Sequence, residues 1–347
     1  MRAVRYAAFG ELPLVEEMPD PQPVDGGVVV EVRATGLCRS DWHGWAGHDA
    51  DITPPHIPGH EFAGVVRSVG AGVERVRVGD RVVFPFVLGC GECETCRAGA
   101  AQVCPHQWQP GFNGPGSFAE LVAVPAADFN AVTLPPEVSF EVAAGLGCRF
   151  ATAYRGVVDV AKVRSGERVV VVGCGGVGLA AVMIAASLGA EVLAVDVSSG
   201  ALDAAAFGGA THLVDGSKVL ADEVRRVWAE GADVAVDALG SIATARSATE
   251  SLGVHGRHLQ IGLLPPAVVA DRATVPMNLV IARELQVLGS HGMAAADYPR
   301  MLADIAAGRL QPERLLGRMI SLDEAPAALV AMGDGTPAAP GVTIIRP

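Results

Sequence analysis

Hydrophobic and polar positions divide the chain into three regions with different periodicities. Up to about residue 150, short β-branched runs such as 28–32 and 64–69 alternate with glycine and proline turns. No helical periodicity of useful length precedes Glu137. These patterns predict a β-rich first region made of short strands and loops.

From about residue 151 to 288, apolar runs of strand length alternate with helix-compatible segments. Strands are predicted at 168–172, 191–195, 212–214, 232–237, 258–261 and 285–288. Helices are predicted between several of them, at 177–188, 201–207, 219–230 and 242–252. This alternation predicts a parallel sheet covered by helices on both faces, and six strands complete a doubly wound α/β domain.

The third region follows residue 289 and contains a predicted helix at 298–307, then strand-like sequence to residue 345. Because it is too short for a domain of its own, we expect it to pack on the first region. The predicted domains are therefore 1–150 together with 290–347, and 151–289.

Composition narrows the classes of function. The chain carries 26 basic and 38 acidic side chains, a formal charge of −12, which argues against nucleic acid or an anionic membrane as the main partner. The uncharged run 169–190 is long enough to cross a bilayer, but its clustered glycines favour a strand, a turn and a helix inside an α/β domain. We predict no signal peptide, and therefore a cytoplasmic protein with reduced cysteines.

A glycine-rich loop, Gly-Cys-Gly-Gly-Val-Gly, follows the first strand of the middle region. Gly173 permits the tight turn, Gly175 lets backbone amides approach a pyrophosphate, and Gly178 lets the helix pack closely on the strand. Gly176 and Val177 complete the loop at the helix N-terminus, which favours phosphate charge. The loop therefore predicts a dinucleotide site.

Asp196 stands at the end of the next strand-like segment. A carboxylate at that point accepts hydrogen bonds from the adenosine ribose hydroxyls and repels a 2′-phosphate. The sequence therefore favours NAD over NADP.

Four cysteines lie close together in a loop-like segment of the first region: Cys90, Cys93, Cys96 and Cys104. Four thiolates at short spacing suit a structural zinc ion with no open coordination position. An iron–sulfur cluster also takes four thiolates, but the last gap is longer than in the bacterial ferredoxin pattern. Two disulfides would require an oxidising compartment. We favour zinc.

Three other segments carry candidate ligands: Cys38-Arg39-Ser40-Asp41-Trp42-His43, Gly59-His60-Glu61, and Gly147-Cys148-Arg149-Phe150-Ala151-Thr152. Spacing alone does not unite them. With the glycine loop and the four cysteines, however, they resemble the zinc-dependent alcohol dehydrogenases of the medium-chain dehydrogenase/reductase superfamily. The most specific element is Gly59-His60-Glu61 followed by Gly64 and Gly70.

The resemblance covers essentially the whole chain and implies its fold class. We expect α/β plus β architecture: a chaperonin-10-like (GroES-like) catalytic domain built from both chain ends, with an inserted doubly wound (Rossmann) nucleotide-binding domain. By the same resemblance, Cys38, His60 and Cys148 hold a catalytic zinc, with water, substrate or transiently Glu61 in the fourth position. Asp41 is expected to orient His60. Two zinc ions per chain are expected in all.

The implied reaction is reversible hydride transfer between an alcohol and NAD. The proton is expected to pass from the alcohol to Ser40, then to the nicotinamide ribose hydroxyl, and to leave through His43. A hydroxyl can donate and accept at once, and an imidazole titrates near neutral pH, so both residue types suit this relay.

Other residues are expected, by resemblance, to contact the cofactor. Arg39 would bind the pyrophosphate, and Thr152, Ile261 and Gly262 would lie near the nicotinamide. Ala201 stands where family members often place a lysine that grips the adenosine, so NAD is expected to bind more weakly than in those members.

The substrate is less constrained. A cysteine at position 148 resembles the alcohol dehydrogenases proper, and Phe86 matches a pocket position. Trp42, Trp45 and Trp108 offer aromatic walls, although each is better explained by packing. A hydrophobic primary alcohol or its aldehyde, aromatic or allylic, is the expected substrate.

Two other functions stay open: another medium-chain reductase acting on a carbonyl or polyol, and a non-catalytic protein that binds NAD or zinc. The paired ligand sets argue against a zinc-free reductase. Ser40 and His43 beside the ligands argue against a protein that has lost activity. A homodimer or homotetramer is expected.

Overall fold

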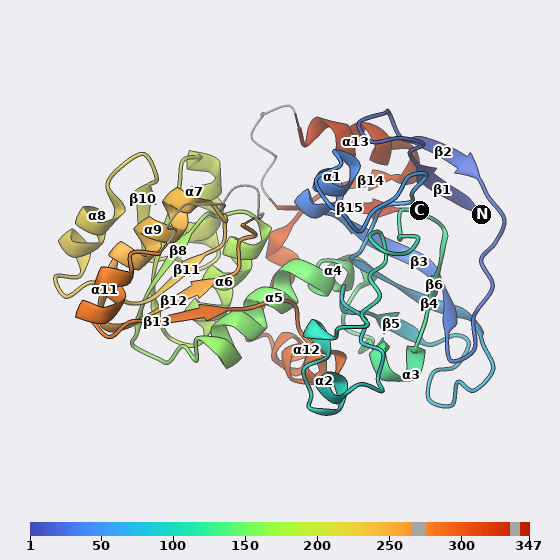
Figure 1. The fold of residues 1–347 in the computed structure, drawn as a ribbon, viewed down its shortest axis with the longest axis horizontal. Helices are drawn as coiled ribbons and strands as arrows, with labels where there is room; N and C mark the ends of the chain where they lie inside the picture. The colour runs from blue at the N-terminus through green and yellow to red at the C-terminus, as the bar shows by residue number, and fades with distance from the viewer. Residues whose placement is uncertain (265–274, 334–340) are drawn as a thin grey trace. The chain divides into compact units, whose positions relative to one another are not determined.

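The computed structural model describes residues 1–264, 275–333 and 341–347, which form two compact units (Figure 1). Unit 1 comprises Met1–Ala151, Gly292–Gly308 and Leu316–Pro347. Unit 2 comprises Thr152–His291 and Arg309–Leu315. Both chain ends belong to unit 1, and the predicted limits of the domains stay a proposal.

Unit 1 is built on a seven-stranded sheet in the order β14-β15-β3-β4-β5-β7, with β6 also paired to β3 and a separate β1-β2 pair. Its strands are β1 (Arg2–Arg5), β2 (Leu14–Glu17), β3 (Val28–Leu37), β4 (Phe62–Val69), β5 (Arg81–Val83), β6 (Leu121–Val124), β7 (Val132–Thr133), β14 (Leu316–Ser321) and β15 (Val342–Arg346). Its helices are α1 (Arg39–Trp45), α2 (Glu94–Arg97), α3 (Ala127–Asn130), α4 (Phe140–Ala144), α12 (Tyr298–Ala306) and α13 (Ala325–Ala331).

The C-terminal strand β15 lies beside the N-terminal strand β3 in this sheet. The pairing is antiparallel, with Thr343 opposite Leu37 and Ile345 opposite Thr35. The C-terminal strand of the third region therefore pairs with the first region, whereas Arg309–Leu315 belong to unit 2. Alternate positions of β3 carry Val28, Val30 and Val32, which are buried together in one apolar cluster.

Unit 2 contains a six-stranded, all-parallel sheet in the order β10-β9-β8-β11-β12-β13. Its strands are β8 (Arg168–Val172), β9 (Glu191–Asp196), β10 (His212–Asp215), β11 (Ala232–Asp237), β12 (Leu252–Gln260) and β13 (Gln286–Gly289). Its helices are α5 (Ala151–Tyr154, which begins on the last residue of unit 1), α6 (Gly176–Ser187), α7 (Ser199–Phe207), α8 (Leu220–Val227), α9 (Ile242–Glu250) and α11 (Met277–Ala282).

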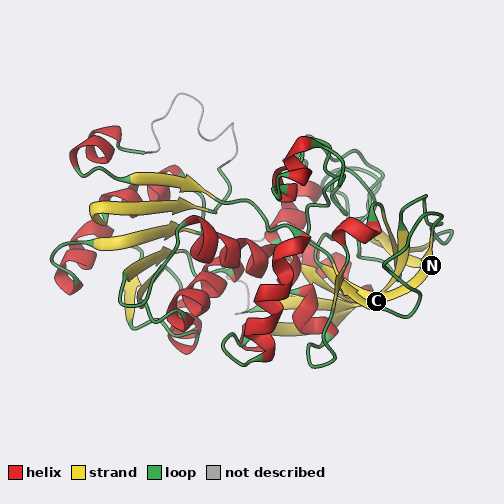
Figure 2. Cartoon of the chain, turned by 90° about the horizontal axis from the view of Figure 1, so that it is seen from below, coloured by secondary structure: helices red, strands yellow, loops and turns green. Residues whose placement is uncertain are grey.

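This strand order reverses direction between β8 and β11, which is the doubly wound topology predicted from the alternation of strands and helices. Helices pack along these strands in Figure 2. The central strand β8 is fully covered from Val169 to Val171, as a parallel strand between two helical layers must be.

Several predicted elements differ from the structure. Helices α1, α2 and α3 lie before Glu137, where the sequence shows no helical periodicity, because each is only one or two turns long. The predicted strand 258–261 is longer and begins at Leu252 as β12.

The predicted helix 242–252 ends earlier, because Leu252 is fully buried and pairs with Ala232 as the start of β12. The predicted helix 219–230 ends at Val227, because Trp228 leaves helical geometry and packs into the apolar cluster under the sheet. In the C-terminal region a helix, α13, stands where only strand-like sequence was expected.

The uncharged run 169–190 forms β8, the glycine loop and α6, as predicted. Among the described residues there is no helix with the length and apolar content needed to span a bilayer.

Candidate active site and cofactor loop

Two neighbouring strands bring Cys38 and His60 to the same edge of the unit 1 sheet. In the antiparallel pair β3–β4, Thr35 lies opposite Phe62. The residues just after β3 and just before β4 must therefore be neighbours. Gly36 confirms this register, because its N–H donates to the carbonyl of Glu61 at 2.8 Å.

Gly59 determines how the chain enters this corner. Its φ is +105°, and a Cβ there would lie 2.5 Å from a ring carbon of Phe118 and 2.7 Å from its backbone nitrogen. Only glycine fits both restrictions. His60 and Glu61 follow directly and are buried.

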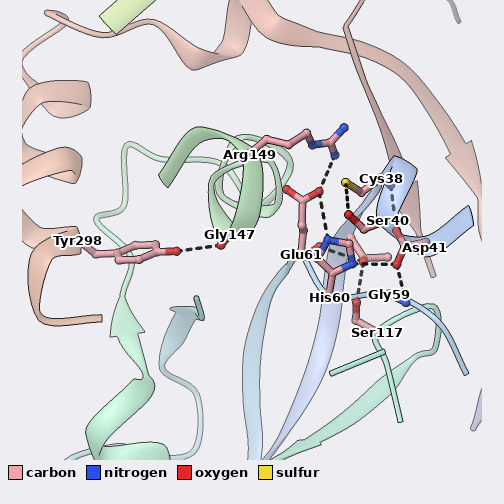
Figure 3. Close-up of polar contacts among 11 residues, drawn as sticks. Cys38, Ser40, Asp41, Gly59, His60, Glu61, Ser117, Gly147, Arg149 and Tyr298 are labelled. Carbon is pink, nitrogen blue, oxygen red and sulfur yellow. Dashed lines mark hydrogen bonds and ion pairs between the residues drawn. The ribbon is translucent and has the colours of Figure 1, made fainter. Parts of the chain in front are cut away.

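Asp41 connects the two ligand segments. Its Oδ1 lies 2.8 Å from Nδ1 of His60 and accepts the N–H of Gly59 at 3.1 Å (Figure 3). Its Oδ2 accepts the N–H of Cys38 at 2.9 Å, which also caps α1. A histidine that donates through Nδ1 presents Nε2 as a ligand.

Cys148 comes from a π-helical turn, Leu146–Phe150, that precedes α5. The carbonyl of Gly147 accepts two hydrogen bonds at 3.1 Å, from the hydroxyl of buried Tyr298 and from the N–H of Phe86. π-helical turns often occur at functional sites, and this one is anchored on both sides.

The candidate ligand atoms of Cys38, His60, Glu61 and Cys148 all lie within 4.8 Å of one another. Nε2 of His60 is buried and has no hydrogen-bond partner among the described residues. A buried imidazole nitrogen is costly to leave without a partner. One imidazole nitrogen and two cysteine sulfurs together form a donor set that Zn²⁺ prefers. The residues therefore fit zinc.

Electrostatics in the cluster favour a thiolate at Cys38, whereas the hydrogen bond to Cys38 and burial raise the pKa of Cys148. A hydrogen bond from the Cys148 thiol lowers the pKa of Cys38 well below its usual range despite burial, and the charge of Arg149 acts in the same direction. Burial lowers the pKa of His60, but the charge of Asp41 and its hydrogen bond outweigh this effect and raise it.

Glu61 is fully buried, and its Oε1 lies 2.8 Å from Nη2 of Arg149 and 4.0 Å from Nε2 of His60. Burial raises the pKa of Glu61 to about 7, although the charge of Arg149 opposes the shift. This carboxylate thus lies between a cation and the ligand cluster.

The four clustered cysteines form a second candidate metal site. Sγ of Cys90 lies 4.0 Å from that of Cys96 and 3.6 Å from that of Cys104, and Sγ of Cys93 lies 3.7 Å from that of Cys104. A tetrahedral ion with Zn–S bonds of about 2.3 Å separates its sulfurs by about 3.8 Å. A disulfide would need about 2 Å. These residues too fit zinc.

The predicted relay residues lie on α1. Oγ of Ser40 is 3.8 Å from Sγ of Cys38, next to the ligand cluster. Nδ1 of His43 lies 3.0 Å from Nδ1 of His48, which is exposed. Burial lowers the pKa of His43, and the charges of Arg39 and His48 act in the same direction.

Arg39 donates to the carbonyl of Met332, and its guanidinium lies 4.3 Å from the ring centroid of Trp42. Three tryptophans pack against apolar clusters of unit 1, namely Trp42, Trp45 and Trp108. They have the packing role that the sequence favoured.

Two phenylalanine rings approach His60 edge-on. The ring centroid of Phe86 lies 6.1 Å from that of His60, and Phe112 is closer, at 5.2 Å. Phe86 was expected at the pocket from sequence, whereas Phe112 was not. The imidazole of His60 therefore lies against two aromatic rings.

In unit 2, the glycine loop has the backbone geometry predicted for Gly173 and Gly178. Gly173 has a φ of +90°, and a Cβ on Gly178 would lie 1.7 Å from the Gly173 carbonyl oxygen. Gly175 is exposed, and a Cβ there meets no atom within 4 Å. Gly176 and Val177 begin α6, whose first turn has no acidic residue.

Asp196 ends β9 beside this loop. Its Oδ2 accepts the N–H of Cys174 at 2.8 Å, and its Oδ1 accepts the N–H of Ser198 at 2.9 Å. A carboxylate has about four acceptor positions, so these two bonds orient it and leave capacity for ribose hydroxyls.

The remaining predicted cofactor residues also lie in unit 2. Thr152 is buried on α5. Ile261 and Gly262 follow β12, and their N–H groups both donate to the carbonyl of Asp237, at 3.0 and 2.8 Å. The side chain of Asp237 accepts from the N–H groups of two loop residues, Leu239 and Gly240. One aspartate therefore joins two loops at the carboxyl edge of the sheet, where doubly wound folds bind ligands.

Sequence reasoning missed three residues around the candidate zinc site: Phe112, Arg149 and Tyr298. Arg149 had a signal, because a charged residue directly follows a predicted metal ligand. The other two come from distant segments, and no local pattern marks them.

The chain is similar to known proteins in both sequence and structure. Residues 24–136 match the alcohol dehydrogenase GroES-like domain, and residues 176–307 match the zinc-binding dehydrogenase family. An L-threonine 3-dehydrogenase of Rhizobium etli is 30% identical over 330 residues, 92% of each chain. An alcohol dehydrogenase of Geobacillus stearothermophilus is 32% identical over 314 residues, 90% of each chain. The solved structure of an NAD-dependent alcohol dehydrogenase, 31% identical, superposes over 100% of both chains with a TM-score of 0.88.

Proposed function

The chain belongs to the zinc-binding medium-chain alcohol dehydrogenase family, and we propose that it reversibly oxidises a hydrophobic primary alcohol to the aldehyde with NAD. The convergence of Cys38, His60 and Cys148, with the buried Nε2 of His60 unpaired among the described residues, carries the proposal. Such a set provides three protein ligands and leaves a fourth position for the substrate.

Cys38, His60 and Cys148 hold the catalytic zinc, which when bound acts as a Lewis acid that lowers the pKa of the substrate hydroxyl. Cys90, Cys93, Cys96 and Cys104 hold a second, structural zinc. Asp41 fixes the tautomer of His60 by accepting from its Nδ1.

The chain's own groups handle the proton. Ser40 Oγ lies next to the ligand cluster and accepts the hydroxyl proton as it releases its own proton toward His43. His43 is neutral at neutral pH because burial lowers its pKa, so it can accept a proton. Its contact with exposed His48 gives that proton a path to solvent.

NAD is the proposed cofactor. The open space above Gly175 and the capless N-terminus of α6 support a pyrophosphate position there. Asp196 supports NAD over NADP, because a carboxylate repels a 2′-phosphate. Arg39, Thr152, Ile261 and Gly262 stay proposed cofactor contacts.

The substrate proposal depends on the surface beside His60. Phe86 and Phe112 both approach that ring, and aromatic walls favour an apolar alcohol over a zwitterion. L-Threonine is the second candidate, because relatives 30% identical over most of the chain are L-threonine 3-dehydrogenases. A cytoplasmic location and a homodimeric or homotetrameric state stay predictions.

A spectrophotometric screen tests the proposal. Purified protein is assayed for NADH formation with aliphatic, allylic and aromatic alcohols and with L-threonine, and NADP runs in parallel. We expect the highest kcat/KM for an apolar primary alcohol with NAD, and no turnover for Cys38→Ser. Higher kcat/KM for L-threonine would establish the second candidate, and no turnover of any alcohol or of threonine would contradict both.

A further inference from the structure

Arg149 has a buried guanidinium beside the candidate zinc ligands, and neither the metal nor the proton path uses it. Its side chain is 11% exposed, and its Nη2 lies 2.8 Å from Oε1 of Glu61, which is fully buried. Nε and Nη2 make no hydrogen bond with any described residue, so the ion pair to Glu61 is the contact that offsets this buried charge. Figure 3 shows the guanidinium facing that carboxylate from the turn that carries Cys148.

Gly36 leaves room for this ion pair because it has no side chain. A Cβ on Gly36 would lie 2.9 Å from Nη2 of Arg149 and 3.5 Å from the side chain of Glu61. The backbone of Glu61 is fixed independently, because its carbonyl accepts the N–H of Gly36 and the hydroxyl of Thr35. A carboxylate oxygen of Glu61 is itself one of the candidate ligand atoms that lie within 4.8 Å of one another, while Oε1 is paired with Nη2 of Arg149. The guanidinium and a bound metal would therefore compete for the same carboxylate.

Charge balance favours the ion pair of Glu61 with Arg149 over coordination of the metal by Glu61. A Zn²⁺ ion with two thiolates and a neutral imidazole has no net charge. If Glu61 became the fourth ligand, it would add a negative charge, weaken the Lewis acid and fill the position that substrate needs. An arginine is always charged and can hold a carboxylate in place.

We propose that Arg149 is a positioning residue that holds the Glu61 carboxylate off the catalytic zinc and so keeps the fourth coordination position open. This inference rests on the proposed zinc-dependent function and names what controls access to the same metal.

The test measures access to the metal directly, without NAD or turnover. The catalytic zinc is replaced by Co²⁺, whose visible absorption reports its ligands, and imidazole is titrated as an external ligand. In the wild type, we expect imidazole to change the cobalt spectrum. In Arg149→Met, we expect Glu61 to occupy the position and the apparent Kd for imidazole to rise, because imidazole must then displace a carboxylate. We expect a rise of about tenfold or more, the factor by which outer-shell groups of metal sites commonly change metal affinity or activity.

Substitution of Glu61 separates positioning from a merely structural role. In the double variant Arg149→Met with Glu61→Gln, no carboxylate remains to compete, so imidazole affinity should return to that of Glu61→Gln alone. Arg149→Lys keeps the positive charge and should restore part of the affinity. Alcohol KM should rise in Arg149→Met more than kcat falls.

Gly36→Ala gives a second route if Arg149→Met does not fold, because its methyl group pushes the guanidinium away without removing its charge. It should weaken imidazole binding in the same direction. Arg168→Met removes a more exposed ion pair, with Asp233 in unit 2, and should leave imidazole binding unchanged.

The inference is wrong if Arg149→Met, or Gly36→Ala where that variant replaces it, leaves imidazole affinity unchanged, or if Arg149→Met lowers it equally with Glu61 and with Gln at position 61. Failure of the proposed function looks different: the wild-type cobalt spectrum would not respond to imidazole at all, or wild-type protein with two bound zinc ions would form no NADH.

Discussion

Nδ1 of His60 lies 2.8 Å from Oδ1 of Asp41, and both side chains are buried. The same carboxylate accepts the N–H of Gly59 and the N–H of Cys38. One side chain therefore aims the imidazole and also ties together the two segments that carry the first two candidate ligands. The zinc site depends on Asp41 although Asp41 is not among the ligands.

Substitution of Asp41 by Ala should selectively weaken the catalytic zinc. Loss of the carboxylate frees the imidazole to rotate and leaves two buried N–H groups unpaired, so we expect a loss of metal affinity of about 10–100-fold. Zinc per chain after dialysis should fall from two to one. Asp128→Asn is the matched control, since Asp128 also accepts three backbone N–H groups in unit 1 and should leave two zinc ions. Two tightly held zinc ions in Asp41→Ala would contradict the role of the carboxylate.

Loss of a ligand should affect turnover at one metal site and thermal stability at the other. Cys38→Ser should abolish turnover with little change in thermal unfolding, because it removes a ligand and little packing. Cys104→Ser should lower the unfolding temperature, because this fully buried thiol belongs to a site that organises a loop. Metal analysis and calorimetry on both variants measure the difference. Equal loss of stability in the two would show that both sites are structural.

Substitution by alanine should have different effects at two glycines of the cofactor loop: loss of stability at Gly178 and weaker NAD binding at Gly175. Gly178→Ala forces a methyl group to within 1.7 Å of a carbonyl oxygen, so we expect it to cost about 3 kcal/mol of unfolding free energy or more. Gly175→Ala meets no protein atom within 4 Å and should fold normally, but its methyl group occupies the side from which a pyrophosphate approaches. Its KM for NAD should rise at least about tenfold. Normal NAD binding by Gly175→Ala would move the pyrophosphate elsewhere.

Asp196→Gly should reduce the preference for NAD over NADP. The variant loses the charge that opposes a 2′-phosphate and the acceptor that orients the loop, so the ratio of the two kcat/KM values should shift toward NADP by about tenfold or more. Asp215→Asn is the control, because Asp215 lies directly opposite Asp196 on the next strand and is exposed. An unchanged ratio in Asp196→Gly would mean that the ribose contact lies elsewhere.

His43→Ala should slow alcohol oxidation more at about pH 7 than at about pH 9, where hydroxide replaces the missing base. The sign follows from the direction of the shift: a lowered pKa keeps His43 unprotonated, and able to accept, across neutral pH. The kcat profile against pH measures the effect, and His48→Gln should show a smaller loss of the same kind. A loss of equal size at all pH values would remove His43 from the proton path.

Features that depend on neighbouring residues could be predicted from the sequence. The limits of β8 and β11 match the predicted segments, because a buried parallel strand is a continuous apolar run between turn residues. The glycine loop and the four cysteines were predicted as units for the same reason: their chemistry depends on spacing of a few residues. Helix ends were less accurate, because Trp228 and Leu252 follow the core of unit 2 and not the helical period.

The sequence by itself determined the alternation that builds the doubly wound sheet, the phosphate-binding turn and the four-thiol cluster, because short-range sterics and periodicity encode them. Only the tertiary structure decided that Glu61 faces Arg149, that Phe112 lies against His60, and that Tyr298 anchors the turn of Cys148. Such contacts join residues up to 151 positions apart. They are selected by how whole sheets and helices pack, and no local pattern of residues records the outcome.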